Sequence, residues 1–286
     1  MTTTVSGAID VWDAMTFDLE LTALLERNVV LIRNYTATEN EIFLFYDYRP
    51  DPQRPTLRPQ NPYTSDFVAL EEEIGKRMLS RTLRAWHYTR LTAPEVDRLF
   101  RDGIHTSTPA TLRTRLDFLV ASGKFTSAQA DRLYIDSPFH GDQMGARLGK
   151  FWMVSHPVAV QYGGVKRLLG FWGGEVASFS LNDPEMLAML EIGKARVIEI
   201  AVPLALTGSY GSYSAGQAAI ASFGRTHGCI TSKHCFDLYV TAPLRPETII
   251  RVHTEGETSF AGMGLTYPVG YRDVDDGYWK ELTGEN

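Results

Sequence analysis

Apolar residues recur at helical spacing in several segments of the chain, and most of these segments carry start and stop signals. The clearest helix begins after Thr92, where Thr-Ala-Pro-Glu forms a capping box with proline in the first turn, and it ends at Gly103. Val96, Leu99 and Phe100 are expected on its buried face. The same signals predict helices over Phe17–Arg27, Ser65–Ser80, Thr108–Ser122, Ser127–Tyr134, Pro157–Tyr162, Asp183–Leu190 and Gln217–Phe223.

Short runs rich in β-branched and aromatic residues predict the strands. Leu83–Arg90 (LRAWHYTR) precedes the capped helix, and Asn28–Tyr35 and Glu41–Tyr48 are expected to form a hairpin because a polar pentapeptide separates them. The remaining predicted strands are Lys150–Val154, Glu175–Leu181, Arg196–Val202, Phe236–Thr241 and the end of Pro246–Val252. Because helices dominate the first half of residues 63–286 and strands dominate the second half, the pattern indicates an α+β fold.

Five prolines between Pro50 and Pro62 interrupt regular structure, because each lacks a backbone N–H and restricts the residue before it. This segment predicts a division of the chain. Residues 1–62 would form an N-terminal α/β extension of a helix, a hairpin and a proline-rich linker, and residues 63–286 the main domain. The glycine-rich stretch Gly208–Gly216 is expected to be a mobile loop.

Composition narrows the class of protein. The chain of 286 residues is 44% hydrophobic and 22% charged, as in ordinary globular proteins, and its net charge of −6 gives no global attraction to nucleic acid. We find no secretory signal pattern and no apolar run approaching the roughly 18 residues of a membrane helix. Two cysteines, Cys229 and Cys235, are too few for a disulfide framework. We therefore expect a cytoplasmic protein without a membrane partner.

Several common catalytic arrangements are missing from the sequence. No pair of the seven histidines has the i, i+4 spacing of a helical metal site, so we expect no metal. His234 and Cys235 are neighbours on an extended segment and would point to opposite faces, which disfavours a cysteine nucleophile. The chain also lacks the G-x-S-x-G and P-loop patterns.

Three separated motifs remain as candidates for chemistry. The first is His87 on its predicted strand, within WHYTRL…EVDRLFRDGI. The second is GKFWMVSHPVAVQYGG, in which an aromatic strand is followed by a serine and by Tyr162. The third is Asp237 at the head of the apolar strand in FDLYVTAPLRPETII.

In this order the motifs resemble the H-Y-E class of the ADP-ribosyltransferase superfamily, the diphtheria-toxin and poly(ADP-ribose) polymerase type. The first motif also resembles the start of DNA-targeting ADP-ribosyltransferase toxins and of RNA 2′-phosphotransferases, which share that fold. The resemblance covers about 170 residues, roughly Leu83–Val252. It implies split antiparallel β-sheets with flanking helices, and NAD as a substrate.

The resemblance also implies residue roles. His87 would bond the adenosine ribose of NAD and the backbone of Tyr88 the nicotinamide amide, with Tyr162 stacking on nicotinamide and Asp237 as the catalytic acid. Asp237 stands where the family has glutamate, and Glu175 is the reserve acid. Further expected contacts are Thr89, Phe151, Trp152 and Ser155, with Arg90 and Arg147 as pyrophosphate ligands because a guanidinium binds phosphate bidentately.

We therefore expect an NAD-dependent mono-ADP-ribosyltransferase, of the kind found in bacterial toxins, effectors or defence enzymes. Its target would be a protein or nucleic acid, and an antitoxin or immunity protein could be a partner. Two alternatives stay open. One is an NAD glycohydrolase, with water as acceptor, and the other is an inactive nucleotide-binding or interaction module of the same fold.

Overall fold

The computed structural model describes residues 7–46, 57–208 and 210–267. These residues divide into two compact units, each assembled from separate stretches of the chain. Among the described residues, the first unit contains residues 7–8, Thr82–Gly211 and Phe236–Tyr267, and the second contains Ile9–Arg81 and Ser212–Cys235. The domain division expected after residue 62 falls inside the second unit and stays a prediction, since part of the proline-rich segment lies outside the described residues.

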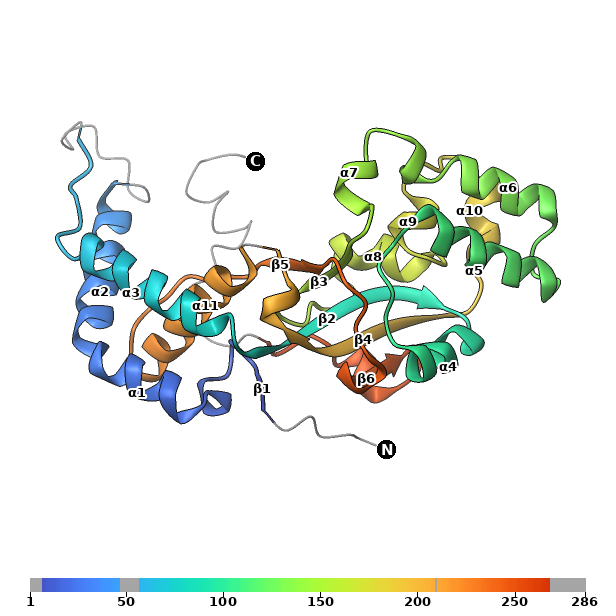
Figure 1. Cartoon of the computed structure of the whole chain (residues 1–286). Coiled ribbons are helices and arrows are strands. Elements are labelled where there is room, and N and C mark those ends of the chain that lie inside the picture. The colour runs from blue at the N-terminus through green and yellow to red at the C-terminus, as the bar shows by residue number, and fades with distance from the viewer. Residues whose placement is uncertain (1–6, 47–56, 209, 268–286) are drawn as a thin grey trace. The chain divides into compact units, whose positions relative to one another are not determined.

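An antiparallel sheet organises the first unit (Figure 1). The strand order is β5–β3–β2–β4–β6, and the two-residue β1 (Ala8–Ile9) is the sixth strand. The bounds are β2 Thr82–Leu91, β3 Phe151–Val154, β4 Lys194–Pro203, β5 Asp237–Val240 and β6 Ile249–Thr254. β2 and β4 pair along their whole length, whereas β2 meets β3 only at Trp86↔Val154. The predicted α+β class is confirmed.

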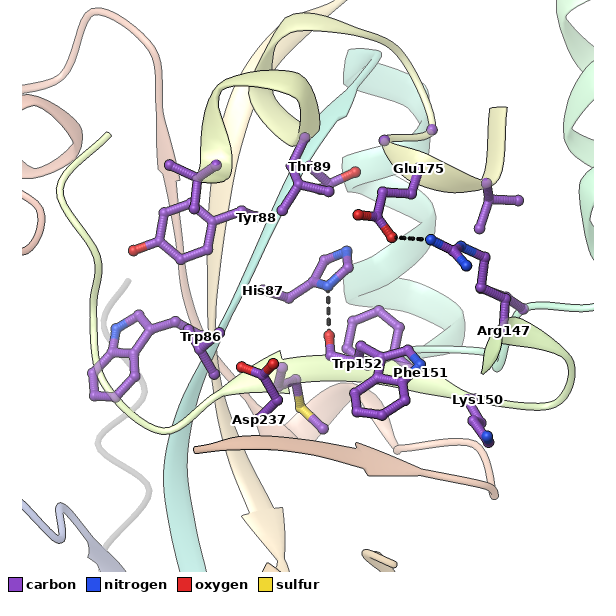
Figure 2. A pocket seen from close by; sticks show the side chains of 18 of the residues that line it. Trp86, His87, Tyr88, Thr89, Arg147, Lys150, Phe151, Trp152, Glu175 and Asp237 are labelled. Atoms are coloured by element: carbon purple, nitrogen blue, oxygen red, sulfur yellow. Dashed lines mark hydrogen bonds and ion pairs between the residues drawn. The ribbon is translucent and has the colours of Figure 1, made fainter. Parts of the chain in front are cut away.

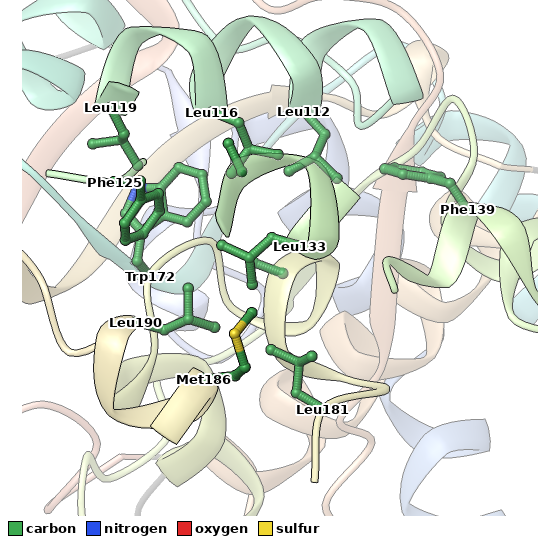
Figure 3. Packing of buried hydrophobic residues seen from close by; sticks show 12 residues of the cluster. Leu112, Leu116, Leu119, Phe125, Leu133, Phe139, Trp172, Leu181, Met186 and Leu190 are labelled. Carbon is green, nitrogen blue, oxygen red and sulfur yellow. The ribbon is translucent and has the colours of Figure 1, made fainter. Parts of the chain in front are cut away.

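Helices of the first unit build two apolar cores. In one core, Leu112, Leu116 and Leu119 of α5 pack with Leu133 of α6 and with Trp172 (Figure 3). In the other, α8 and α12 cover one face of β2 and β4. The helices of this unit are α4 Ala93–Asp102, α5 Pro109–Ala121, α6 Ser127–Ile135, α7 Met144–Arg147, α8 Gly163–Gly170, α9 Glu175–Ser178, α10 Pro184–Met189 and α12 Thr258–Ala261.

The second unit is helical in its described part. It contains α1 (Leu19–Arg27), α2 (Val29–Tyr46), α3 (Thr64–Met78) and all but the first residue of α11 (Gly211–Thr226). α3 and α11 approach so closely that a Cβ on Gly216 would lie 3.0 Å from the backbone nitrogen of Gly75. Within the described residues, no helix of either unit combines the length and apolar character that a membrane crossing requires.

The helices predicted after Thr92, over Thr108–Ser122 and over Ser127–Tyr134 are confirmed. α4 begins after Thr92 and ends at Gly103, whose φ of 83° is the left-handed value that favours glycine. α5 starts after the predicted cap Thr108, and α6 starts at Ser127 as predicted, with Thr126 as its cap. The predicted buried face of α4 is wrong in part: Phe100 is 51% exposed, Val96 and Leu99 are only partly buried, and the buried residue of the helix is Glu95.

The predicted hairpin over residues 28–48 is wrong, since α2 occupies Val29–Tyr46 and the last two residues lie outside the described range. Its β-branched and aromatic residues suggested strands. The buried positions, however, follow a helical period: Ile32 and Ile42 are buried, and Tyr35 between them stacks on Phe67 of α3 at 3.7 Å between ring centroids. Tertiary packing has outweighed local propensity here.

Three other segments also differ from expectation. Residues 157–162 are not helical, because the Tyr88 hydroxyl bonds both the N–H and the C=O of Val158, and the helix (α8) starts afterwards, at Gly163. Glu175 opens a helical turn, α9, rather than a strand. The stretch predicted as a mobile loop is helical from Gly211 onward, because small residues such as Gly216 allow the close approach to α3.

Candidate active site

A cavity of about 360 Å³ opens beside the sheet of the first unit. Its walls come from β2, β3 and the first residue of β5, from α7 and α8, and from the turn that leads into α9. Figure 2 shows His87 and Asp237 pointing into this cavity from β2 and β5, with Glu175 and Arg147 on the opposite wall. The volume lies within the usual range for small-molecule sites.

His87 has one hydrogen-bond partner that fixes its tautomer. Its Nδ1 lies 2.8 Å from the carbonyl oxygen of Trp152. A carbonyl only accepts, so Nδ1 must carry the proton, and in the neutral ring Nε2 is then an acceptor. Burial lowers the pKa of His87 to about 4, and the nearby Arg115 charge acts in the same direction. At neutral pH, His87 therefore presents an uncharged acceptor to a ligand hydroxyl.

Aromatic side chains form the wall next to His87. The Phe151 ring lies 4.3 Å from the imidazole, centroid to centroid. Trp152 is 39% exposed, donates its Nε1–H to the Ala146 carbonyl at 2.8 Å, and lies 4.6 Å from the Tyr239 ring. Lys150 Nζ stands 5.8 Å from the Trp152 ring and 4.9 Å from that of Tyr239. This wall can hold a planar ring by stacking.

Asp237 brings a carboxylate to the cavity from the start of β5. It pairs with Val154 of β3, and alternation along β5 places it on the same face as Tyr239. Its side chain makes no hydrogen bond or ion pair with the described residues. The pKa of the Asp237 carboxyl is raised above its ordinary value, mainly because the carboxyl is partly removed from water. The negative charge of Glu175 is a smaller cause that acts in the same direction. A raised pKa suits a group that must accept a proton during a reaction.

Glu175 supplies a second carboxylate from the opposite wall. Its Oε2 accepts from Nη2 of Arg147 at 2.7 Å, and the same guanidinium donates from Nη1 to Gln143 at 2.9 Å. The preceding glycines, Gly173 and Gly174, both have positive φ (74° and 58°) and turn the chain into α9. The cavity thus contains two carboxylates, one paired with a cation and one not.

A buried network behind this wall fixes the turn that carries Glu175. The Glu95 carboxylate accepts from Trp172 Nε1 at 2.8 Å and from Arg115 Nε at 2.9 Å, and the Thr92 N–H donates to it at 2.9 Å. Burial favours the neutral acid, but the Arg115 charge and these hydrogen bonds outweigh it and hold the pKa of Glu95 below its ordinary value. The Trp172 indole is completely buried, so the adjoining turn is held rigidly.

Of the ten residues singled out from the sequence, seven line the cavity and three do not. Those in the cavity are His87, Tyr88, Thr89, Arg147, Phe151, Trp152 and Asp237, together with the reserve acid Glu175. Those outside it are Arg90, Ser155 and Tyr162.

Each of the three outside residues has a physical reason for its position. The Arg90 guanidinium is held outside the cavity because it donates to the backbone carbonyls of Leu169 and Gly193, both at 3.2 Å. Ser155 is fully buried and accepts from the Phe236 N–H at 3.1 Å, which ties β3 to β5. Tyr162 is 63% exposed, because it stands before α8 rather than at the end of a helix.

Sequence reasoning missed Lys150 and gave Glu175 only a secondary place. The Gly-Gly-Glu sequence was a usable signal for Glu175, since two glycines before an acid mark a turn that can present a side chain. Lys150 had no such signal. In the described part of the chain, no group of three or more His, Cys, Asp or Glu residues could hold a metal ion.

Comparison of the chain with protein-family models, with curated proteins and with solved structures finds no match.

Proposed function

We propose that this protein cleaves NAD and transfers its ADP-ribose to a macromolecular acceptor, as a mono-ADP-ribosyltransferase. The observation that carries the proposal is the convergence on one cavity of His87, of the aromatic pair Phe151 and Trp152, and of Asp237, which lie far apart in the sequence. A second carboxylate in the same cavity, that of Glu175, also supports the proposal. The narrow β2–β3 junction, a single residue pair between two groups of strands, is compatible with the split sheets of such enzymes.

The chemistry of NAD cleavage calls for these residue types. The bond between the ribose C1′ and the nicotinamide nitrogen breaks, its electron pair leaves with nicotinamide, and positive charge develops on the ribose. Carboxylates that face this charge stabilise the transition state. The acceptor then attacks C1′ and loses a proton, for which Asp237, with its raised pKa, is a suitable base.

The binding roles follow from the geometry of the walls. Neutral His87 offers Nε2 to a ribose hydroxyl, while Phe151 and Trp152 offer faces for the nicotinamide or adenine ring. Phe151 and Trp152 replace Tyr162 in this role. Arg147 is the candidate for the pyrophosphate, and Arg90 is not, because its guanidinium is bonded to backbone carbonyls.

The proposal is tested by incubating the protein with NAD labelled in its ADP-ribose part, with and without a cell lysate. We expect released nicotinamide and label on a macromolecule. Asp237→Asn and His87→Ala should each reduce release by about 100-fold, the size expected for loss of acid–base or positioning groups. Asp97→Asn, a charge-matched change on α4 outside the cavity, should leave it unchanged.

Other outcomes assign a different function. Nicotinamide release without labelled macromolecule would indicate an NAD glycohydrolase. Binding of NAD without any turnover would indicate an inactive binding module. Turnover that survives both His87→Ala and Asp237→Asn would remove the proposed site altogether.

A further inference from the structure

Arg147 is held in the cavity wall with one edge incompletely bonded. Its guanidinium stacks on the Phe179 ring at 4.3 Å, and its side chain is only 10% exposed. Stacking covers the flat face and leaves the edges for hydrogen bonds in the plane. Nη1 donates to Gln143 and Nη2 donates to Glu175.

The third nitrogen of Arg147, Nε, is buried and has no hydrogen-bond partner among the described residues. Nε and Nη2 form one edge of the guanidinium, and this edge fits two oxygens of one carboxylate or phosphate at the same time. Glu175 reaches the edge with Oε2 alone, at Nη2. The edge is therefore half filled, and an unsatisfied buried donor is unfavourable.

We propose that the Arg147–Glu175 ion pair is opened by the substrate, whose pyrophosphate takes the Nε–Nη2 edge and releases Glu175 to act on the reacting ribose. This inference rests on the proposed function, in which the cavity takes NAD. Two phosphate oxygens satisfy both Nε and Nη2, so the incoming group makes one hydrogen bond that Glu175 does not make.

The exchange keeps a counter-charge on Arg147 throughout. A buried guanidinium without an anion is strongly unfavourable, and the pyrophosphate replaces one anion with another. Glu175 is 47% exposed, so its side chain can leave the ion pair by a rotamer change without crossing an apolar core. The negative pyrophosphate also repels the carboxylate. Once free, Glu175 lies in the same cavity as Asp237 and can face the positive charge that develops at C1′.

Glu175 therefore competes with the pyrophosphate for Arg147 and assists cleavage of the bond to nicotinamide. A Glu175→Gln variant should accordingly gain affinity for the pyrophosphate but lose turnover. A residue with a purely structural role would lower affinity and turnover together. A residue that only stabilises the transition state would leave the affinity for product-like ligands unchanged.

The experiment measures binding of ADP-ribose by calorimetry to the wild type, to Glu175→Gln and to Glu185→Gln. Glu185, on α10 and outside the cavity, is the charge-matched control. We expect Glu175→Gln to bind ADP-ribose about three- to tenfold more tightly, the size of losing one competing, partly exposed ion pair, and the control to be unchanged. Adenosine, which has no phosphate, should bind all three proteins equally.

Nicotinamide release from NAD should fall at least about tenfold in Glu175→Gln alone.

Each contrary result points to a different conclusion. If the wild type binds ADP-ribose but Glu175→Gln binds it no more tightly, the displacement is wrong and the proposed function stands. An equal gain for adenosine also overturns the displacement, because the gain would not depend on phosphate. If the wild type neither binds ADP-ribose nor releases nicotinamide, both proposals fall. Glu175→Ala serves as a second variant and must show the same gain in affinity.

Discussion

At the scale of single residues, the environment of His87 determines what the cavity can recognise. The ring is partly buried between Phe151 and the Trp152 carbonyl, and this burial keeps it uncharged at neutral pH. A charged imidazolium would present a second donor instead of an acceptor, and it would change the field felt by both carboxylates in the cavity. The packing that buries His87 thus also lowers its pKa and keeps its Nε2 an acceptor.

The same pKa makes stability depend on pH. His87 has a pKa of about 4 in the folded protein against 6.5 in the unfolded chain, so the unfolded chain binds more protons between these values. The free energy of unfolding must fall as pH drops from about 6.5 to about 4. We expect the free energy of unfolding of the wild type to fall by about 1–2 kcal/mol more than that of His87→Gln over this pH window. This difference is smaller than the full pKa shift implies, because the ring is partly open to solvent.

Urea unfolding followed by tryptophan fluorescence at several pH values measures this difference. His105→Gln, at an exposed histidine away from the cavity, should keep the wild-type slope. Parallel curves for wild type and His87→Gln would contradict the neutral, buried assignment of His87.

At the scale of elements, the end of α4 is held by one glycine in a tight position. Gly103 has a φ of 83°, and a Cβ there would lie 2.2 Å from the backbone oxygen of Leu244. That oxygen accepts the Ile104 N–H at 2.8 Å, so it cannot move without loss of a bridge between the two segments. We expect Gly103→Ala to lower the free energy of unfolding by about 3 kcal/mol or more, from backbone strain plus the clash.

Gly123, after α5, provides the matched control. Its φ is 71°, but a Cβ there meets nothing within 4 Å. Gly123→Ala should therefore cost about 1 kcal/mol, the backbone strain alone. Thermal unfolding of the two variants separates the two effects, and equal losses would show that the approach of Leu244 is unimportant.

The elements also show which features the sequence could predict. Capping residues and terminal glycines act locally, and the helices they mark (α4, α5 and α6) were predicted correctly. α2 was missed because its helical state depends on packing against α3 through Ile32 and Tyr35, which the local pattern does not contain. Tyr162 was misplaced for a similar reason, since a distant hydroxyl, that of Tyr88, holds the backbone before it.

The candidate site was predictable in its strand-borne parts. His87, Phe151 and Asp237 lie on strands that short runs of β-branched and aromatic residues predict, and they line the cavity as expected. The Arg147–Glu175 ion pair was not predictable, because it joins two single-turn helices, neither of which the sequence pattern predicts. The exclusion of Arg90 depends on carbonyl groups far away in the sequence, which no local pattern reveals.

At the scale of the whole molecule, the chain passes repeatedly between two compact units while the cavity belongs to one of them. Every residue that lines the cavity lies within Thr82–Gly211 or Phe236–Tyr267, the ranges of the first unit. Ligand affinity should therefore follow the integrity of that unit. Its sheet joins segments from both ranges, since β5 and β6 come from the second range and β2, β3 and β4 from the first.

A pair of cavity-creating substitutions tests this assignment. Ile74 of α3 is fully buried in the second unit, and Leu238 of β5 is buried in the first, directly after Asp237. Ile74→Ala and Leu238→Ala should each cost about 2–4 kcal/mol, because both leave a void in a packed core. Calorimetric unfolding measures this loss. Only Leu238→Ala should weaken ADP-ribose binding, since it loosens the strand that carries Asp237, while Ile74→Ala should stay within about twofold of wild type. A larger loss of affinity in Ile74→Ala would mean that the second unit contributes to the ligand site.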